Sequence, residues 1–170
     1  MPASIQAARA GVTTGEWGNA MRALYGEYRA PTGVSQNPSN RTEGLEPVRD
    51  AVAQVATKLG RPLRLLLGKP GLDGHSNGAE QIATRARDCG IEITYDGIRL
   101  TPQEIVTAAA EKQPDVIGLS ILSGSHLPLI RETLDLMHKA GLTQPLVVGG
   151  IIPEEDAKAL HAMGVAKVYT

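Results

Sequence analysis

The sequence predicts an α/β fold in which a parallel sheet of five strands follows an N-terminal helical extension. Two observations lead to this prediction. Short apolar runs with the length of buried strands recur after residue 62, and segments with a helical spacing of apolar residues separate them. Strands that alternate with helices in this way pair in parallel, and helices then cover both faces of the sheet.

The N-terminal extension, residues 1 to about 29, is predicted to be helical. Thr13 and Glu16 have the spacing of a capping box, in which each side chain bonds the other residue's backbone N–H. After this start, large apolar residues recur on one helical face: Trp17, Met21, Leu24, Tyr25 and Tyr28. Such a face is too large to stay in water, so we expect it to pack against a surface outside this chain.

A linker is predicted for residues 30–44, because Pro, Gly, Ser and Asn dominate there without any periodicity. A helix is expected next, at about 45–59. Its apolar stripe consists of Val48, Val52, Val55 and Leu59. We therefore divide the chain into residues 1–44, the extension with its linker, and residues 45–170, a second domain.

The strands of the second domain are expected at 63–67, 91–95, 116–119, 146–148 and 166–169. Helices are expected between them, at about 77–89, from Thr101, at about 126–139 and from Pro153. Right-handed crossovers and the common strand order 2-1-3-4-5 give a flavodoxin-like (Rossmann-like) sheet. Because the sequence stops at Thr170, directly after the fifth strand, we expect that a closing helix has been cut off.

Three motifs follow strands that this order makes neighbours. The segment Lys69–Gly78 leaves the first strand, Ser120 ends the third, and Gly149-Gly150 ends the fourth. Ligands of open parallel sheets bind beyond the carboxyl ends of such strands, so the three motifs are expected to border one crevice. Ser120 can hydrogen-bond a ligand there, and the two glycines leave room for a ligand against the backbone.

The segment after the first strand carries the candidate metal ligand, His75, since a neutral imidazole binds cobalt, zinc, copper or iron. Asp73 can accept the other ring N–H, which fixes the tautomer and makes the ring a stronger ligand. Lys69 can in turn pair with Asp73. Gly74 and Gly78 allow tight turning and the close approach of a bulky ligand.

The overall composition argues against several functional classes. The 170 residues carry 17 basic and 18 acidic side chains, a net charge of −1, which gives no electrostatic case for nucleic acid or an anionic membrane. No apolar run approaches the ~20 residues that span a bilayer, and no signal peptide is evident. Cys89 is the only cysteine, so a disulfide within the chain is excluded and the cytoplasm is the expected compartment.

The three motifs together resemble a known signature. Asp73-x-His75-x-x-Gly78, Ser120-x-Leu122 and Gly149-Gly150, in this order and spacing, are similar to the cobalamin-binding signature of mutases and methionine synthases. The resemblance implies that His75 binds cobalt in place of the cofactor's own base (base-off/His-on), with Asp73 and Lys69 as its hydrogen-bonded relay. The implied cofactor-binding residues are Lys69, Asp73, Gly74, His75, Gly78, Ser120, Leu122, Gly149, Gly150 and Tyr169.

Further segments narrow the resemblance to one family. Residues 11–18, 26–33 and 71–78 resemble the ethylmalonyl-CoA mutases, a branch of the methylmalonyl-CoA mutase family. This implies the adenosylcobalamin-binding domain of an acyl-CoA mutase, an isomerase that converts ethylmalonyl-CoA to methylsuccinyl-CoA. The resemblance also implies a CoA-ester-binding barrel outside this chain and a homodimer in the full-length enzyme. Without the barrel, these 170 residues are expected to bind cobalamin but not to turn over substrate.

Three other functions remain as alternatives. A free-standing corrinoid carrier for methyl transfer would share the His75 motif but commonly has a helical cap. The small subunit of a two-chain acyl-CoA mutase would not need residues 11–33. A signalling receiver domain on the same fold would need an acidic pair after the first strand and a phospho-accepting Asp after the third, where Ser120 stands.

Overall fold

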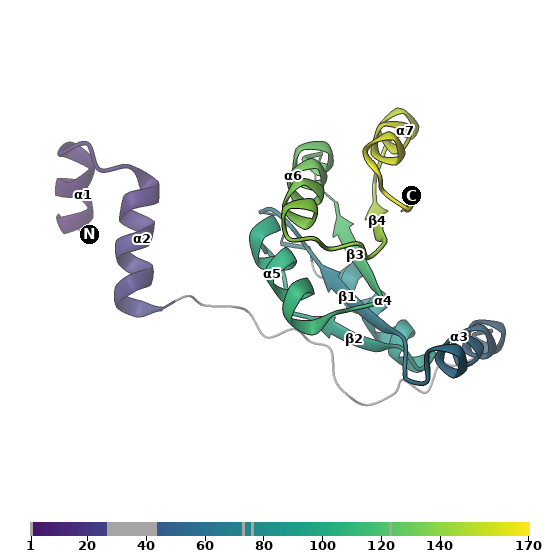
Figure 1. The fold of residues 1–170 in the computed structure, drawn as a ribbon. Helices are drawn as coiled ribbons and strands as arrows, with labels where there is room; N and C mark the ends of the chain where they lie inside the picture. The colour runs from purple at the N-terminus through teal and green to yellow at the C-terminus, as the bar shows by residue number, and fades with distance from the viewer. Residues whose placement is uncertain (1, 27–43, 73, 76, 123) are drawn as a thin grey trace. The chain divides into compact units, whose positions relative to one another are not determined.

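The computed structural model describes residues 2–26, 44–72, 74–75, 77–122 and 124–170. The chain divides into two compact units, residues 1–30 and 31–170, and each is described by itself (Figure 1). Most of the predicted linker, residues 30–43, lies outside the described residues. Among the described residues, no helix has both the length and the apolar character that crossing a bilayer requires.

The first unit contains two helices where the sequence predicted one helical stretch. These are α1 (Pro2–Arg9) and α2 (Thr14–Tyr25). The predicted capping box is confirmed, because Thr13 Oγ1 accepts from the Glu16 N–H at 3.2 Å and Glu16 Oε2 accepts from the Thr13 N–H at 2.9 Å. None of the described residues of the two helices is buried, and Trp17, at 42% exposure, keeps its apolar face open.

The second unit is the predicted α/β fold. Its strands are β1 (Arg64–Gly68), β2 (Glu92–Tyr95), β3 (Val116–Ile121), β4 (Leu146–Gly150) and β5 (Lys167–Tyr169). Its helices are α3 (Glu46–Leu59), α4 (Asn77–Asp88), α5 (Pro102–Lys112), α6 (His126–Lys139) and α7 (Glu154–Met163). All strand pairs are parallel and the order is β2-β1-β3-β4-β5, which confirms the flavodoxin-like prediction.

One face of the sheet is covered by α5, α6 and α7 and holds the main hydrophobic core. Alternate strand residues point into it, among them Leu66 of β1, Ile117 of β3 and Val148 of β4, each at most 2% exposed. Ile105 of α5 and Leu160 of α7 belong to the same cluster. Figure 1 shows α6 and α7 standing side by side over this part of the sheet, and the two helices are in contact.

The opposite face is covered over β1 and β2 only, by α4. A small cluster forms there, in which Ala79 and Ala83 of α4 pack on Leu67 and Tyr95. The expectation that helices cover both faces is therefore met on one face, because no described helix lies over the β3, β4 and β5 part of the other. We call the two sides the covered face and the open face.

Outside the sheet, α3 buries only Val52 of its predicted stripe, while Val48, Val55 and Leu59 are 48%, 39% and 43% exposed. Arg49 Nε donates to the Asp88 carbonyl at 2.8 Å and so ties α3 to the end of α4.

Candidate functional site

The motifs predicted at the strand ends lie side by side at the carboxyl edge of the sheet. Ser120 of β3 pairs with Gly149 of β4, and Ile121 pairs with Gly150. Gly68, the last residue of β1, pairs with Leu119 on the other side of β3. Ser120 is the last residue but one of β3, and the two glycines are the last two residues of β4, so their positions are fixed by the backbone hydrogen bonds of the ladder.

A cavity of about 510 Å³ lies on the open face below this edge. Its walls are mostly aliphatic side chains of alternate strand positions, with Ser120 as a polar side chain and Tyr169 at the far end. The lining residues are Leu63, Leu65, Leu67, Ile82, Ile91, Val116, Gly118, Leu119, Ser120, Val147, Val148, Gly149 and Tyr169. The volume and the apolar walls suit the insertion of a rigid organic group.

The two adjacent glycines of β4 have different roles. A Cβ added to Gly149 would approach only Tyr169, at an ordinary 3.9 Å, so protein packing does not require a glycine there and the space belongs to the cavity. A Cβ added to Gly150, whose φ is +154°, would collide with the carbonyl oxygen of Ile121 in β3. Gly150 is therefore required by the strand pairing itself, whereas Gly149 leaves room for a ligand.

The segment after β1 starts from a well-held backbone. The Leu100 N–H donates to the Lys69 carbonyl, and the Gly71 N–H donates to the Leu100 carbonyl, both at 3.0 Å. Gly71 has a φ of +85°, and a Cβ there would lie 2.9 Å from Leu129 of α6, so this turn needs a glycine. The segment then leaves the sheet edge, with Leu72 91% exposed.

His75, the candidate metal ligand, is exposed and lies two residues before α4 begins. Gly74 and Gly78 were predicted to allow tight turning and the close approach of a ligand. A Cβ added to Gly74 would lie 3.4 Å from Arg99 Nη2, and a Cβ added to Gly78 would have no atom within 4 Å. Asp73, predicted to orient the imidazole, lies outside the described residues. Among the residues that are described, no group of three His, Cys, Asp or Glu side chains could hold a metal ion.

Lys69 is the unexpected member of the predicted set, because it is only 1% exposed. Its Nζ donates to the Ser120 carbonyl at 3.3 Å, across the β1–β3 pair. A buried ammonium group needs such partners, since burial without them costs several kcal/mol. The lysine thus connects the base of the His75 segment to the strand that carries Ser120.

Two further predicted residues are exposed, and one of them lines the cavity. Leu122 follows β3 and is 40% exposed, and Tyr169 of β5 is 59% exposed and lines the cavity. Sequence reasoning missed the other wall residues, of which Gly118, Leu65 and Val147 form the centre of the open face. Their signal was the period of two along each strand, which assigns Gly118 and Ser120 to the same face.

Charge is concentrated at the opposite, amino-terminal edge of the sheet. Arg61 donates to both carboxylate oxygens of Asp115 at 2.8 and 2.7 Å, and the Arg64 N–H donates to the same group at 2.8 Å. The Arg61 hydrogen bonds, aided by the Arg64 N–H, lower the pKa of Asp115 to about 2. On the open face, burial raises the pKa of Tyr95 to about 12. Neither group lines the cavity.

Known structures share this arrangement of strands and helices. A cobalamin-binding protein from Desulfitobacterium hafniense matches with a TM-score of 0.59 and 23% identity, over 89% of this chain and 70% of that one. The monomethylamine corrinoid protein of Methanosarcina barkeri matches with a TM-score of 0.53 and 18% identity, over 76% and 59% of the two chains. At these identities the likeness concerns the fold.

Curated relatives are much closer in sequence. Ethylmalonyl-CoA mutases of Cereibacter sphaeroides and Methylorubrum extorquens are 68% and 58% identical over the whole of this chain. The chain spans about a quarter of their length, 26% and 25%. The small subunit of 2-hydroxyisobutanoyl-CoA mutase from Aquincola tertiaricarbonis is 40% identical over 63% of this chain and 79% of its own.

The match to a family model coincides with the α/β unit. The model of the B12 binding domain covers residues 63–169, from just before β1 to the last residue of β5, and includes every residue of the predicted site. The chain therefore belongs to the B12-binding domain family and is homologous to the cobalamin-binding region of the ethylmalonyl-CoA and methylmalonyl-CoA mutases.

Proposed function

We propose that the chain binds cobalamin across the carboxyl edge of its sheet, with the nucleotide tail in the open-face cavity and His75 on cobalt. The apolar cavity of about 510 Å³ carries this proposal, because it lies directly below the strand ends that hold Ser120 and Gly149. The space beside Gly149 fits a flat heteroaromatic base. A single exposed imidazole fits a metal that arrives already held by the four nitrogens of a macrocycle.

The roles of the other residues follow from their positions. Asp73 would accept the second ring N–H of His75 and so fix its tautomer, and Lys69 would hold both Asp73 and the Ser120 carbonyl. The Ser120 hydroxyl would bond the nucleotide base, and Leu122 would pack on it. Gly74, Gly78 and Gly150 shape the backbone around the ligand, and Tyr169 closes the far end of the cavity.

The activity of the whole protein is also a proposal. We infer an acyl-CoA mutase, specifically an ethylmalonyl-CoA mutase of the cytoplasm, in which residues 1–44 end a CoA-ester-binding barrel and residues 45–170 form the cobalamin domain. The identity of 68% over the whole chain to such an enzyme supports this. When bound, adenosylcobalamin supplies the organic radical of the rearrangement, while the protein binds and orients the cofactor. A homodimer of the full-length enzyme completes the proposal.

The ligand assignment is tested by visible spectra of the chain mixed with hydroxocobalamin at neutral pH. Wild type is expected to show the features of histidine-ligated cobalt. His75→Ala should show a base-off spectrum or no binding. His138→Ala is the matched control, since His138 is also exposed but lies in the last turn of α6. Wild-type features in His75→Ala would refute the assignment.

The relay is tested separately with Asp73→Asn, which keeps the shape of the side chain but removes its charge. An amide is a poorer acceptor for the imidazole N–H, so the affinity for cobalamin is expected to fall by about 10–100-fold, as for other residues that orient a metal ligand. Spectrophotometric titration measures this change. An unchanged dissociation constant would remove Asp73 from this role.

A further inference from the structure

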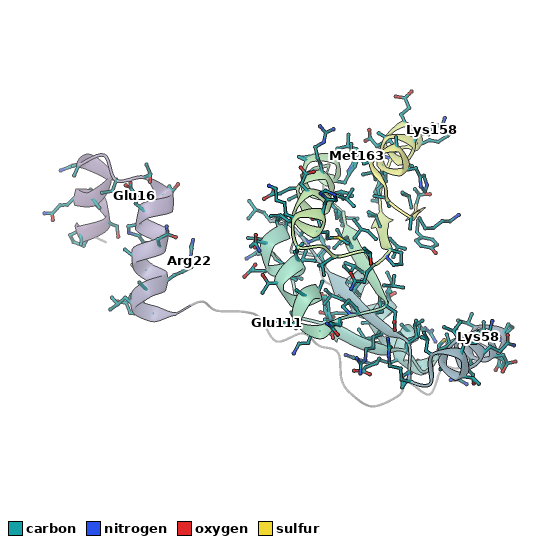
Figure 2. All side chains as sticks on the ribbon, in the orientation of Figure 1. Glu16, Arg22, Lys58, Glu111, Lys158 and Met163 are labelled. Atoms are coloured by element: carbon teal, nitrogen blue, oxygen red, sulfur yellow. The ribbon has the colours of Figure 1, made fainter. Side chains whose placement is uncertain are left out.

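A histidine that no part of the proposed site uses is buried close to it. His126 is the first residue of α6 and is 4% exposed. Its Nε2 lies 2.8 Å from Oδ2 of Asp156, in the first turn of α7. The pair therefore links the starts of two neighbouring helices that come from different strands. Met163 of α7 lies toward α6 as well, which shows that the two helices pack together (Figure 2).

The second nitrogen of the ring gives a reason to suspect a role beyond stability. Nδ1 of His126 is buried and has no hydrogen-bond partner among the described residues. A buried polar atom without a partner destabilises the folded state, and an apolar residue of similar volume would avoid that cost. A histidine at this position is thus a poor choice for stability alone, and the bond to Asp156 is the contact that distinguishes it from an apolar residue.

The strands that precede the two helices connect this pair to the cavity. β3 ends at Ile121 and leads to α6, and β4 ends at Gly150 and leads to α7. Ser120 and Gly149, which pair with each other across these strands, line the cavity. A bond between the first turns of α6 and α7 therefore fixes the separation of the two segments that leave this wall of the cavity.

We propose that His126 and Asp156 are positioning residues for the nucleotide tail of cobalamin. The pair, hereafter the α6–α7 brace, holds the carboxyl ends of β3 and β4 at the spacing that the tail requires. This rests on the proposed function of the chain and deepens it. A residue pair on the covered face would control how well a cavity on the open face accepts the nucleotide tail.

Two amide variants of different length test whether the bond to Asp156 matters, or only the presence of a polar residue at position 126. The side-chain amide of Gln in H126Q reaches about as far as Nε2 and can still bond Asp156, whereas the shorter Asn in H126N matches Nδ1 and falls short. D156A removes the acceptor without adding bulk, at a residue whose side chain is 32% exposed. The probes are cobalamin and cobinamide, a corrinoid that lacks the nucleotide tail.

We expect H126Q to bind both corrinoids as wild type does. H126N and D156A should bind cobalamin about tenfold more weakly, at the low end for residues that orient a ligand-binding group, and should bind cobinamide normally. The double variant H126N/D156A should lose no more than either single variant, because both changes break the same bond. Normal cobinamide binding also shows that the variants are folded.

Lys158→Ala is the matched control, because Lys158 pairs with Glu154 at 2.9 Å on the same helix but is 73% exposed and extends from its outer side (Figure 2). Exposed pairs of this kind contribute little, so its binding should be unchanged. Wild-type affinity of H126N and D156A for cobalamin, or an equal loss for both corrinoids, would overturn the brace. Failure of the wild type to bind either corrinoid would instead overturn the proposed function.

Discussion

The two faces of the sheet are built from the same strands but differ in what they bury. On the covered face, Leu66, Ile117 and Val148 point into a core closed by three helices. On the open face, Leu65, Gly118 and Val147, their alternate neighbours, line a cavity. Over β1 and β2 this face is closed in part by α4, which packs on Leu67 and Tyr95.

Along each strand, residues that face the core therefore alternate with residues that face the cavity, and we expect the first to affect stability and the second to affect binding. Apolar contacts on the covered face exist in the folded protein at all times, so substitutions there should act on the free energy of unfolding. If the proposed function holds, apolar residues of the open-face cavity gain further contacts when the nucleotide tail fills it. Substitutions there should act on affinity and leave stability nearly unchanged.

The adjacent glycines of β4 give the largest expected contrast. Gly150→Ala should lower the free energy of unfolding by about 3 kcal/mol or prevent folding, because the new Cβ collides with the Ile121 carbonyl oxygen. Gly149→Ala should change it by less than about 1 kcal/mol, since its Cβ meets only Tyr169 at 3.9 Å. Urea denaturation measures both, and similar losses would contradict the assignment.

The adjacent valines of β4 test the same division with identical chemistry. Val148 is 1% exposed on the covered face, and Val147 is half-buried on the open face. Val148→Ala should cost about 2 kcal/mol for the two lost methyl groups and the void they leave. Val147→Ala should cost under about 1 kcal/mol but weaken cobalamin binding. A larger stability loss at Val147 would show that the open face is a second core.

The amino-terminal edge of the sheet should affect stability alone. Asp115→Asn removes a charged partner of Arg61 and should lower the free energy of unfolding by about 1–2 kcal/mol at pH 7 without changing corrinoid affinity. The pKa of Asp115 falls from an ordinary 3.8 to about 2 on folding, so its contribution is present above pH 4 and disappears as the pH falls through about 2. Unfolding curves of both proteins should therefore converge between pH 4 and pH 2.

Tyr95→Phe is expected to have the smallest effect. The hydroxyl of Tyr95 is buried under α4 without a hydrogen-bond partner among the described residues. Its removal leaves the packing in place and relieves an unsatisfied donor, so the protein should be unchanged or more stable by up to about 1 kcal/mol. A clear loss of thermal stability would mean that the hydroxyl has a partner in solution.

The sequence predicted the fold well because periodicity and turn chemistry agree along the α/β unit. Thr101, Pro102 and Glu104 start α5 as expected, and the strand order is the common one for sheets of this kind. The extension was predicted less well: the capping box at Thr13 marked the start of α2, but residues 1 to about 29 were still treated as one helical stretch, and the end of α1 at Arg9 was missed.

The site was predicted in outline from motifs at strand ends, and its walls were not. Ser120 and Gly149 were placed correctly at one edge, because neighbouring parallel strands end together. Gly118 was missed because a glycine inside a strand carries no chemistry of its own. The bond between His126 and Asp156 was missed because the two residues are far apart in the sequence and meet only through the packing of α6 on α7.

The most direct test of the open-face assignment compares corrinoid binding by wild type and Gly149→Val. The branched side chain suits a strand, and its Cβ would meet only Tyr169, at 3.9 Å, so stability is expected to change little while the two methyl groups occupy cavity space. We predict that affinity for cobalamin falls at least about tenfold, or about 1.4 kcal/mol, while affinity for cobinamide stays the same. Unchanged cobalamin affinity in this variant would contradict the account, since the nucleotide tail would then lie elsewhere.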